Sequence, residues 1–271
     1  MNNRTRFACL VCLVVASATS SFAYIITSYQ MVLGNPSSAG TGAENYLKQL
    51  PQYALGYQSS KGIPKWVAWS LTSGDQGSGR YDGNFITDTS LPAGMKRVTH
   101  ADYTNSGYDR GHMCPNADRN ITLADSKETF ILTNIQPQRP DNNQGIWANF
   151  ETYCRNLTNS TGREVLIMSG GYGSAGTIGT NAVTVPTYNW KIAILVPAGS
   201  GSPITKINAN PAGTRVIALR VPNIAGIRTT PWTNYITTAS SLQGSTALAF
   251  FTALNSTART TLLNDLDNGT N

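Results

Sequence analysis

The sequence predicts a single α+β domain, and three features of its pattern support this prediction. Residues 165–168, 190–196 and 215–221 are apolar runs rich in β-branched side chains, which is typical of buried strands. Residues 142–157 form the clearest helical segment, with polar side chains at the start that can accept bonds from its free amides. Strands and helices do not alternate strictly along the chain, so the pattern favours an α+β domain over a doubly wound sheet.

Two strands are expected before these elements, over residues 53–57 and 65–72, with a turn at residues 59–62 between them. Trp66 and Trp69 are three positions apart, so they point to opposite faces of the second strand. Both indole rings are therefore expected to pack in the core or at its edge.

A loop follows at residues 74–83, where Gly and Asp are frequent and Arg80 is the only cation. The remaining chain predicts strands at residues 98–103 and 130–135, and short helices at residues 123–128, 247–254 and 258–266. No internal repeat or low-complexity linker divides it, so we expect residues 24–271 to form one domain.

The first 23 residues have the pattern of an export signal. Arg4 and Arg6 form a short basic start, residues 7–18 are apolar, and small residues occupy the cleavage positions in Ser21-Phe22-Ala23. The apolar run is too short to span a membrane in the mature protein. A buried N-terminal helix is the alternative. We expect residues 1–23 to be a signal peptide and the product to be secreted, extracellular or periplasmic, with no membrane attachment after cleavage.

The length and charge of the chain limit the classes of protein to which it can belong, but do not identify one class. A chain of 271 residues can bury one substantial core, and 40% hydrophobic with 13% charged residues is typical of a globular protein. Removal of the signal takes away two arginines and no acids, so the net charge falls from +6 to about +4. A mildly basic surface helps to recruit polyanions, although many exported proteins share it.

Signal cleavage leaves Cys114 and Cys154 as the only cysteines. Two cysteines in an exported chain suggest one disulfide, and two buried free thiols are the alternative. A zinc site is not expected, because two Cys and two His without a short pairing do not have the usual ligand spacing.

The segment Asp109-Arg110-Gly111-His112 contains the best candidate for a catalytic base. An imidazole titrates near neutrality, so His112 can take a proton from water at working pH. Gly111 permits a sharp turn or a close approach of the backbone to another group. A lone histidine is more often structural. The side chains of the predicted helix therefore decide whether His112 is interpreted as catalytic or structural.

That helix has an unusual polar stripe. The side chains that recur at four-residue spacing are those of Asn143, Trp147, Glu151 and Arg155. Such a mixture is a poor core pattern, and a solvated face with a Glu151–Arg155 ion pair is the alternative. Mg²⁺ prefers oxygen ligands and often takes only one or two protein groups, so Asn143 and Glu151 would suffice. Arginines suit the charge that grows on a phosphate during hydrolysis.

Beyond these residues, long motifs resemble a known family. Asp109-Arg110-Gly111-His112-Met113, with Pro115 and Ala117-Asp118-Arg119, is similar to the DRGH motif of the DNA/RNA non-specific endonuclease family. The similarity continues through Thr133-Asn134, Pro137-Gln138, Pro140-Asp141-Asn142-Asn143 and Glu151-Thr152-Tyr153-Cys154-Arg155. The resemblance implies a ββα-metal (His-Me finger) nuclease fold, with two strands and a helix around one divalent ion and a central antiparallel sheet flanked by helices.

The resemblance also implies roles for the residues of the site. His112 would be the general base, Asn143 the direct metal ligand, and Glu151 the carboxylate that holds the water shell of the metal. The arginines that stabilise the transition state would be Arg80 and Arg155.

Two further residues would support this site. Asn134 would orient it, and Asp109 would act through its neighbours. Cys114 departs from the family pattern, in which a small non-thiol residue is usual. A disulfide between Cys114 and Cys154 is therefore an inference from this sequence alone.

The function implied is that of a secreted, sugar-non-specific endonuclease that hydrolyses phosphodiester bonds of DNA and RNA to 5′-phosphate products. The cofactor would be Mg²⁺, with Mn²⁺ as a substitute. Expected partners are single- and double-stranded nucleic acids and, as for related nucleases, a protein inhibitor. A non-catalytic nucleic-acid-binding protein is disfavoured because the catalytic set is complete, and an enzyme of small phosphodiesters is the nearer alternative.

Overall fold

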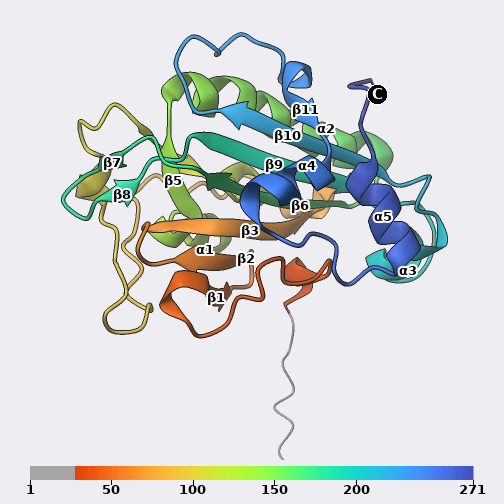
Figure 1. Ribbon diagram of the computed structural model, residues 1–271, viewed down its shortest axis with the longest axis horizontal. Coiled ribbons are helices and arrows are strands. Elements are labelled where there is room, and N and C mark those ends of the chain that lie inside the picture. The colour runs from red at the N-terminus through yellow and green to blue at the C-terminus, as the bar shows by residue number, and fades with distance from the viewer. Residues whose placement is uncertain (1–27, 271) are drawn as a thin grey trace, which may run out of the picture.

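A seven-stranded antiparallel sheet runs through the centre of the computed structural model, which describes residues 28–270 (Figure 1). In spatial order its strands are β1 (Tyr46–Gln49), β2 (Ala54–Gln58), β3 (Ile63–Leu71), β6 (Val165–Tyr172), β9 (Tyr188–Leu195), β10 (Arg215–Pro222) and β11 (Ile236–Thr237). The expected strands at residues 53–57, 65–72, 165–168, 190–196 and 215–221 are thus confirmed. The expected signal peptide, residues 1–23, lies outside the described residues.

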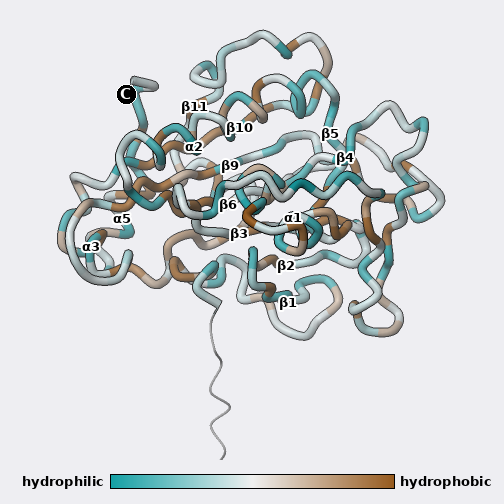
Figure 2. The backbone as a smooth tube through the Cα atoms, turned by 180° about the vertical axis from the view of Figure 1, so that it is seen from behind, coloured by the Kyte–Doolittle hydropathy of each residue, from teal (hydrophilic) through white to brown (hydrophobic). Residues whose placement is uncertain are grey.

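Helices cover one face of the sheet at one end. These helices are α3 (Pro203–Ala209), α4 (Ala239–Thr246) and α5 (Ser256–Asn264), and they pack through Ile207, Leu242 and Leu262. Side chains alternate between the two faces of a strand, so Trp66 belongs to this core and Trp69 to the opposite one, as expected. Figure 2 shows the arrangement from behind, with brown apolar segments in the core elements and paler or teal segments in many outer loops.

The opposite face of the sheet is covered by the longest helix, α2 (Ala148–Thr161), which packs through Phe150, Cys154 and Leu157. The predicted helix at 142–157 is confirmed as an element, but it begins with a π-helical turn at Asn142–Trp147. Gly162 ends it in the left-handed conformation, with φ of 65°. A π turn inserts extra backbone and is frequent at functional sites.

A two-stranded antiparallel ribbon lies beside this helix. It consists of β4 (Asp109–His112) and β5 (Ile135–Gln138), with His112 opposite Ile135. The connection between the strands contains α1 (Leu123–Thr129), which confirms the helix expected at 123–128. A smaller ribbon, β7 (Thr177–Ile178) with β8 (Val183–Thr184), packs nearby. The β4–β5 ribbon followed by the helix forms the ββα arrangement.

Three expected elements are wrong. Residues 98–103 contain a 3-10 helix, His100–Tyr103, because Thr99 and Asp102 form a capping box that satisfies the backbone locally. Residues 130–135 contain the 3-10 helix Leu132–Asn134 before β5 begins.

The expected helix at 247–254 consists of turns, since Ala247 and Phe251 have positive φ angles. The helix of this region is α4, which precedes the expected segment. It begins after Thr238, whose side chain accepts a hydrogen bond from the amide of Ser241. The helix expected at 258–266 is confirmed as α5. Across residues 28–270, no helix combines the length and the apolar character needed to cross a membrane.

Candidate active site

His112 is the last residue of β4, and its ring is enclosed by aromatic side chains. Its ring centroid lies 5.2 Å from that of Phe85 and 4.9 Å from that of Phe130. Its carbonyl oxygen accepts a hydrogen bond of 3.1 Å from Trp147 Nε1, which ties the ribbon to the helix. Within residues 28–270, the buried Nε2 atom of His112 has no hydrogen-bond partner.

The surroundings of His112 keep its ring neutral. Burial lowers its pKa to about 3, and the nearby positive charges of Arg80 and Lys191 act in the same direction. An imidazole with such a low pKa is unprotonated at neutral pH, which is the form that a general base requires.

Asn134 fixes the chain that follows His112. Its Oδ1 accepts a bond of 2.9 Å from the amide of Cys114, and its Nδ2 donates to the carbonyl of Cys114 at 2.8 Å. The same Nδ2 also donates to the carbonyl of Thr129 at 2.9 Å, and the side chain is completely buried. Asn134 therefore holds the backbone in place and is shielded from any ligand.

Asn143 lies in the π turn opposite β4. Its Nδ2 donates a hydrogen bond of 2.9 Å to Asp109 Oδ2, and the neighbouring Gln144 donates to the same oxygen at 2.7 Å. The amide nitrogen of Asn143 is thus engaged, while its Oδ1 has no hydrogen-bond donor within the described part of the chain. An amide oxygen held in this way is available to a cation.

Glu151 lies two turns further along the helix, and its partner is a residue that the sequence pattern did not reveal. Lys191 Nζ, on β9, donates a bond of 2.7 Å to Glu151 Oε1. Lys191 is only 1% exposed, and its ammonium lies 4.1 Å from the ring centroid of Trp147. Burial raises the pKa of Glu151, and the charge of Lys191 opposes this increase. The only signal for Lys191 in the sequence was a cation within the apolar run at residues 190–196.

Arg155 follows on the same helix face. Its Nη1 donates a bond of 2.9 Å to Asp118 Oδ1, and the other carboxylate oxygen of Asp118 accepts from Trp69 Nε1 at 3.0 Å. The alternative Glu151–Arg155 ion pair is therefore not formed, because each side chain has a different partner. Asp118, quoted within the motif but given no role there, is fully buried and fixes the guanidinium.

Arg80 reaches the site from the loop before β4. The loop is held in place by a bond of 2.7 Å from the amide of Gly79 to the carbonyl of Asn120, and by one from Tyr81 to Ser126. Arg80 is exposed, and its charge contributes to the low pKa of His112. Throughout residues 28–270, its guanidinium has neither an ion pair nor a side-chain hydrogen bond.

Gly111 is required by a close contact across the ribbon. A Cβ atom at this position would lie 1.8 Å from Gln138 Oε1, so the side-chain amide of Gln138 occupies the space above the glycine. Arg110 next to it lies over the ring of Tyr103 at 5.6 Å and donates to the carbonyl of His100. Residues 109–112 therefore form a strand whose side chains are individually held.

The two cysteines of residues 28–270 are free thiols, which corrects the expected disulfide. Cys114 and Cys154 are both completely buried in the apolar core between the sheet and α2. Burial raises the pKa of each thiol far above its ordinary value. Each sulfur atom therefore serves as a small apolar group in the packing.

The available oxygen atoms fit one hard divalent cation. Asn143 has a free amide oxygen, and Glu151 has a carboxylate oxygen that Lys191 does not engage, on the same helix. Among the described residues there is no group of three or more His, Cys, Asp or Glu side chains that could hold a metal. A site with so few protein ligands suits Mg²⁺, which keeps several of its waters, better than a zinc-type cage.

The fold and the site together define a ββα-metal nuclease, with the ribbon of β4 and β5 facing the helix that holds Asn143 and Glu151. The family model described as DNA/RNA non-specific endonuclease matches residues 34–257, so the chain belongs to this family. This family is a metal-dependent type of nuclease, and its substrates are nucleic acids.

Several curated proteins are similar to this chain. A nuclease of Nostoc sp. is 41% identical over 244 residues, which cover 89% of this chain and 87% of that protein. A nuclease of Syncephalastrum racemosum is 32% identical, over 82% of this chain and 71% of its own length. Human mitochondrial endonuclease G is 35% identical over 167 residues, and the match spans 56% of each protein.

One solved structure supports the fold. A chain in the crystal structure of the EndoG/EndoGI complex superposes with a TM-score of 0.71, covering 85% of this chain and 94% of that chain. The sequence identity is 24%, so this likeness concerns the fold alone. The predicted ββα-metal nuclease fold is confirmed.

Proposed function

We propose that this protein is a secreted, Mg²⁺-dependent, sugar-non-specific endonuclease that hydrolyses DNA and RNA to 5′-phosphate products, with Mn²⁺ as a substitute metal. The observation that carries the proposal is the pairing of a neutral His112 with an Asn143 whose amide oxygen is left free by Asp109. A base and a cation ligand on facing elements are the parts that metal-assisted hydrolysis of a phosphodiester needs.

In this mechanism His112 acts first. Its neutral imidazole removes a proton from a water molecule, which attacks phosphorus in line with the departing 3′ oxygen. The enclosing rings of Phe85 and Phe130 hold the imidazole in one position, so little reorganisation precedes the attack. When bound, the divalent cation would neutralise phosphate charge and supply acidic water beside the leaving oxygen.

The arginines deal with the charge that develops on the phosphate. Arg155 is held by Asp118, and a guanidinium fixed in this way needs little ordering when the transition state forms. Arg80 is free of protein partners in the described structure and can turn toward the substrate. Asn143 and Glu151 would hold the cation or its waters, and Asp109 and Lys191 keep these two side chains in place.

Recognition would depend on the nucleic-acid backbone. All the cationic groups of the site suit phosphate, which is common to DNA and RNA and to single and double strands. Binding should therefore weaken steeply as the salt concentration rises.

The cellular setting is a second part of the proposal. We infer that residues 1–23 are removed as a signal peptide, that residues 24–271 form one domain, and that the product is extracellular or periplasmic without membrane attachment. The solved structure that matches this fold is the crystal structure of the EndoG/EndoGI complex, which concerns the mechanism of EndoG inhibition. A protein inhibitor is accordingly a proposed partner of this nuclease as well.

One assay tests the proposal as a whole. The mature protein is incubated with plasmid, RNA and a chromogenic small phosphodiester, with EDTA and then with added Mg²⁺ or Mn²⁺. We expect both nucleic acids to be degraded, EDTA to stop the reaction, and either metal to restore it. Cleavage of the chromogenic ester alone would support an enzyme of small phosphodiesters instead, and binding without cleavage would indicate a non-catalytic protein.

A further inference from the structure

A second polar surface lies on the face of the sheet that is turned away from the catalytic groups. Lys191 points from β9 toward α2. Side chains alternate along a strand, so the adjacent Trp190 points to the opposite face. Tyr188 lies two residues before Trp190 and therefore shares its face. Tyr172 of β6 is paired with Tyr188 in the sheet register, and Arg220 of β10 lies on the same face. These three side chains lie at one end of the sheet, because Tyr172 is the last residue of β6, Tyr188 the first of β9, and Arg220 lies near the end of β10.

The two tyrosines form an aromatic stack, in which each ring covers one face of the other. Their ring centroids are 5.3 Å apart and their planes differ by only 16°, so the rings are stacked. The guanidinium of Arg220 lies 5.7 Å from the centroid of Tyr188 and is exposed. Both tyrosines are half-buried, which leaves part of each ring accessible.

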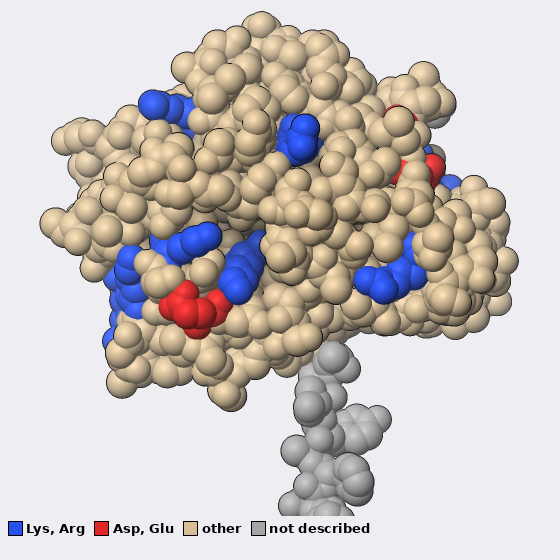
Figure 3. All heavy atoms as spheres, viewed as in Figure 1, with Lys and Arg blue, Asp and Glu red and all other residues tan. Residues whose placement is uncertain are grey.

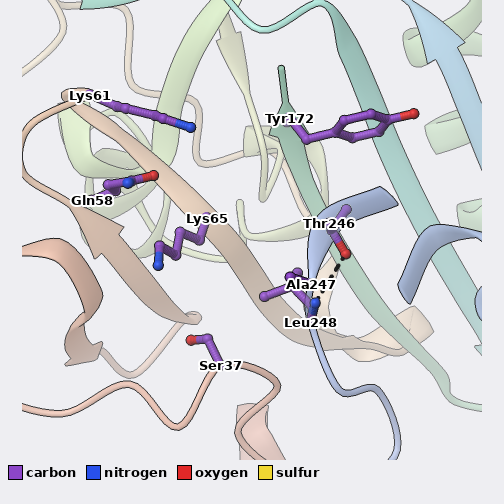
Figure 4. Close-up of a pocket in the computed structure, with 9 residues that line it drawn as sticks. Ser37, Gln58, Lys61, Lys65, Tyr172, Thr246, Ala247 and Leu248 are labelled. Carbon is purple, nitrogen blue, oxygen red and sulfur yellow. Dashed lines mark hydrogen bonds between the residues drawn. The ribbon is translucent and has the colours of Figure 1, made fainter. Parts of the chain in front are cut away.

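A hollow adjoins this surface on the side of β3. Its volume is about 280 Å³, and its lining includes Lys61, Lys65, Gln58, Ser37 and Tyr172. Figure 4 shows the two lysines and Gln58 on one side of the hollow, and Tyr172, Thr246 and Leu248 on the other. The ring of Tyr172 extends away from the lysines, so it continues the surface toward Tyr188.

The charge of this region is positive on balance. Across residues 28–270, neither Lys61, Lys65 nor Arg220 has a salt-bridge partner. The carboxylate of Glu44 lies near Lys65 and offsets part of this charge, because hydrogen bonds from Ser60 and the charge of Lys65 lower its pKa. Figure 3 shows this face, with Lys and Arg side chains gathered around a single acidic group over the ends of β1, β2 and β3.

We propose that this surface, defined by Lys61, Lys65, Tyr172, Tyr188 and Arg220, is a second binding site for single-stranded nucleic acid. The lysines and the arginine fit phosphates, and the ring of Tyr172, which borders the hollow, fits an unpaired base, because bases stack on aromatic side chains without regard to sequence. The proposal rests on the proposed function, because its ligand is the substrate of that reaction.

The dimensions of the surface suit several nucleotides. Lys65 on β3 and Arg220 on β10 are separated by three strand spacings, about 14 Å. At the rise of a base-stacked strand, about 3.4 Å per nucleotide, this distance corresponds to roughly four base steps. A long strand held here stays tethered to the protein after one cut, which raises its effective concentration for the next.

Single strands are favoured over duplexes by the position of the aromatic rings. The faces of the bases are buried inside a duplex, whereas a single strand exposes them to the ring of Tyr172. A duplex would contact only the cations, so removal of a ring should affect single strands selectively.

Binding of a fluorescent oligothymidylate, measured by anisotropy in a His112→Ala background, tests this site. We expect Lys61→Ala with Lys65→Ala to weaken binding about tenfold and to reduce the salt slope of log Kobs by about 1.4. Tyr172→Leu should weaken binding about tenfold, whereas Tyr172→Phe, which keeps the ring, should bind like the parent. Lys206→Ala, on α3, is the control for loss of a cation elsewhere.

Two comparisons keep this proposal separate from the proposed function. The same substitutions in the protein with intact His112 should leave hydrolysis of a chromogenic small phosphodiester unchanged. Unaltered oligothymidylate binding by both the lysine pair variant and Tyr172→Leu would overturn the second site. An equal loss of duplex and single-strand binding in Tyr172→Leu would also overturn it. Failure of the wild type to cut plasmid would instead overturn the proposed function.

Discussion

Asp109 determines which end of the Asn143 amide is free, because Asp109 Oδ2 accepts a hydrogen bond of 2.9 Å from Asn143 Nδ2. The two residues are 34 positions apart, on β4 and on the π turn, so this bond also joins the ribbon to the helix. With its nitrogen engaged, the amide presents its oxygen, which is the atom that a divalent cation binds.

Replacement of Asp109 by Ala should therefore weaken metal binding without removing a metal ligand. Residues that orient a ligand typically contribute about 10- to 100-fold to metal affinity. Isothermal titration with Mn²⁺, together with the Mg²⁺ dependence of plasmid cleavage, measures the change. Gln144→Ala is the matched control, since it removes the other donor to Asp109 and leaves Asn143 in place. Equal metal affinity in the Asp109→Ala variant and the wild type would contradict this role.

His112→Ala should lower the turnover number by about 10² to 10⁴, because the attacking water loses its general base. The fold should persist, since the carbonyl bond to Trp147 comes from the backbone and is retained. Initial rates on labelled DNA at saturating Mg²⁺ measure the loss, and the melting temperature checks the fold. Near-normal cleavage would remove His112 from the mechanism.

Lys191→Met should destabilise the protein by roughly 1–3 kcal/mol, because Glu151 then loses the cation that compensates its buried charge. Glu151 keeps some contact with solvent, so the loss of unfolding free energy should be smaller than for a fully enclosed ion pair. Urea unfolding at neutral pH measures the change.

The double variant Lys191→Met with Glu151→Gln provides the control for this interpretation. Its carboxylate is absent, so we expect part of the stability to return while DNA cleavage stays low. A double variant as unstable as the sum of the two single variants would show that the ion pair contributes nothing.

The stability of the protein should fall as the pH decreases from 6.5 toward 3. The folded protein holds the pKa of His112 near 3, whereas in an unfolded chain it is near 6.5. Between these values the unfolded state binds more protons, so acid favours unfolding by at most about 1.4 kcal/mol per pH unit for this group. Urea unfolding at several pH values should show a shallower decrease for His112→Asn. Parallel curves for the two proteins would contradict the low pKa.

Reducing agent should leave the melting temperature unchanged, because Cys114 and Cys154 are free thiols. A native disulfide typically contributes about 2–5 kcal/mol, so its reduction would lower the melting temperature visibly. Thermal unfolding with and without dithiothreitol distinguishes the two states. Labelling of two thiols in unfolded, unreduced protein that lacks residues 1–23, and with them Cys9 and Cys12, gives an independent measurement.

Much of the fold could be predicted because its signals are local. The strands at 165–168, 190–196 and 215–221 are apolar runs, and their burial on both faces produces that pattern directly. The strand expected at residues 98–103 was wrong because side chains there bond to the nearby backbone. Thr99 and Asp102 close a capping box within a segment whose composition is typical of a strand.

The sequence by itself determined the family, the general architecture, and the candidates His112, Asn143, Glu151 and Arg155, since these residues lie in continuous motifs. The tertiary structure alone decided their partners. Lys191 is 40 residues from Glu151, and the packing of α2 against the sheet brings this pair together. Asp118 is 37 residues from Arg155, and the packing of α2 against the connection between β4 and β5 brings this second pair together. The state of each side chain depends on these distant contacts, because burial and neighbouring charge set both its protonation and its orientation.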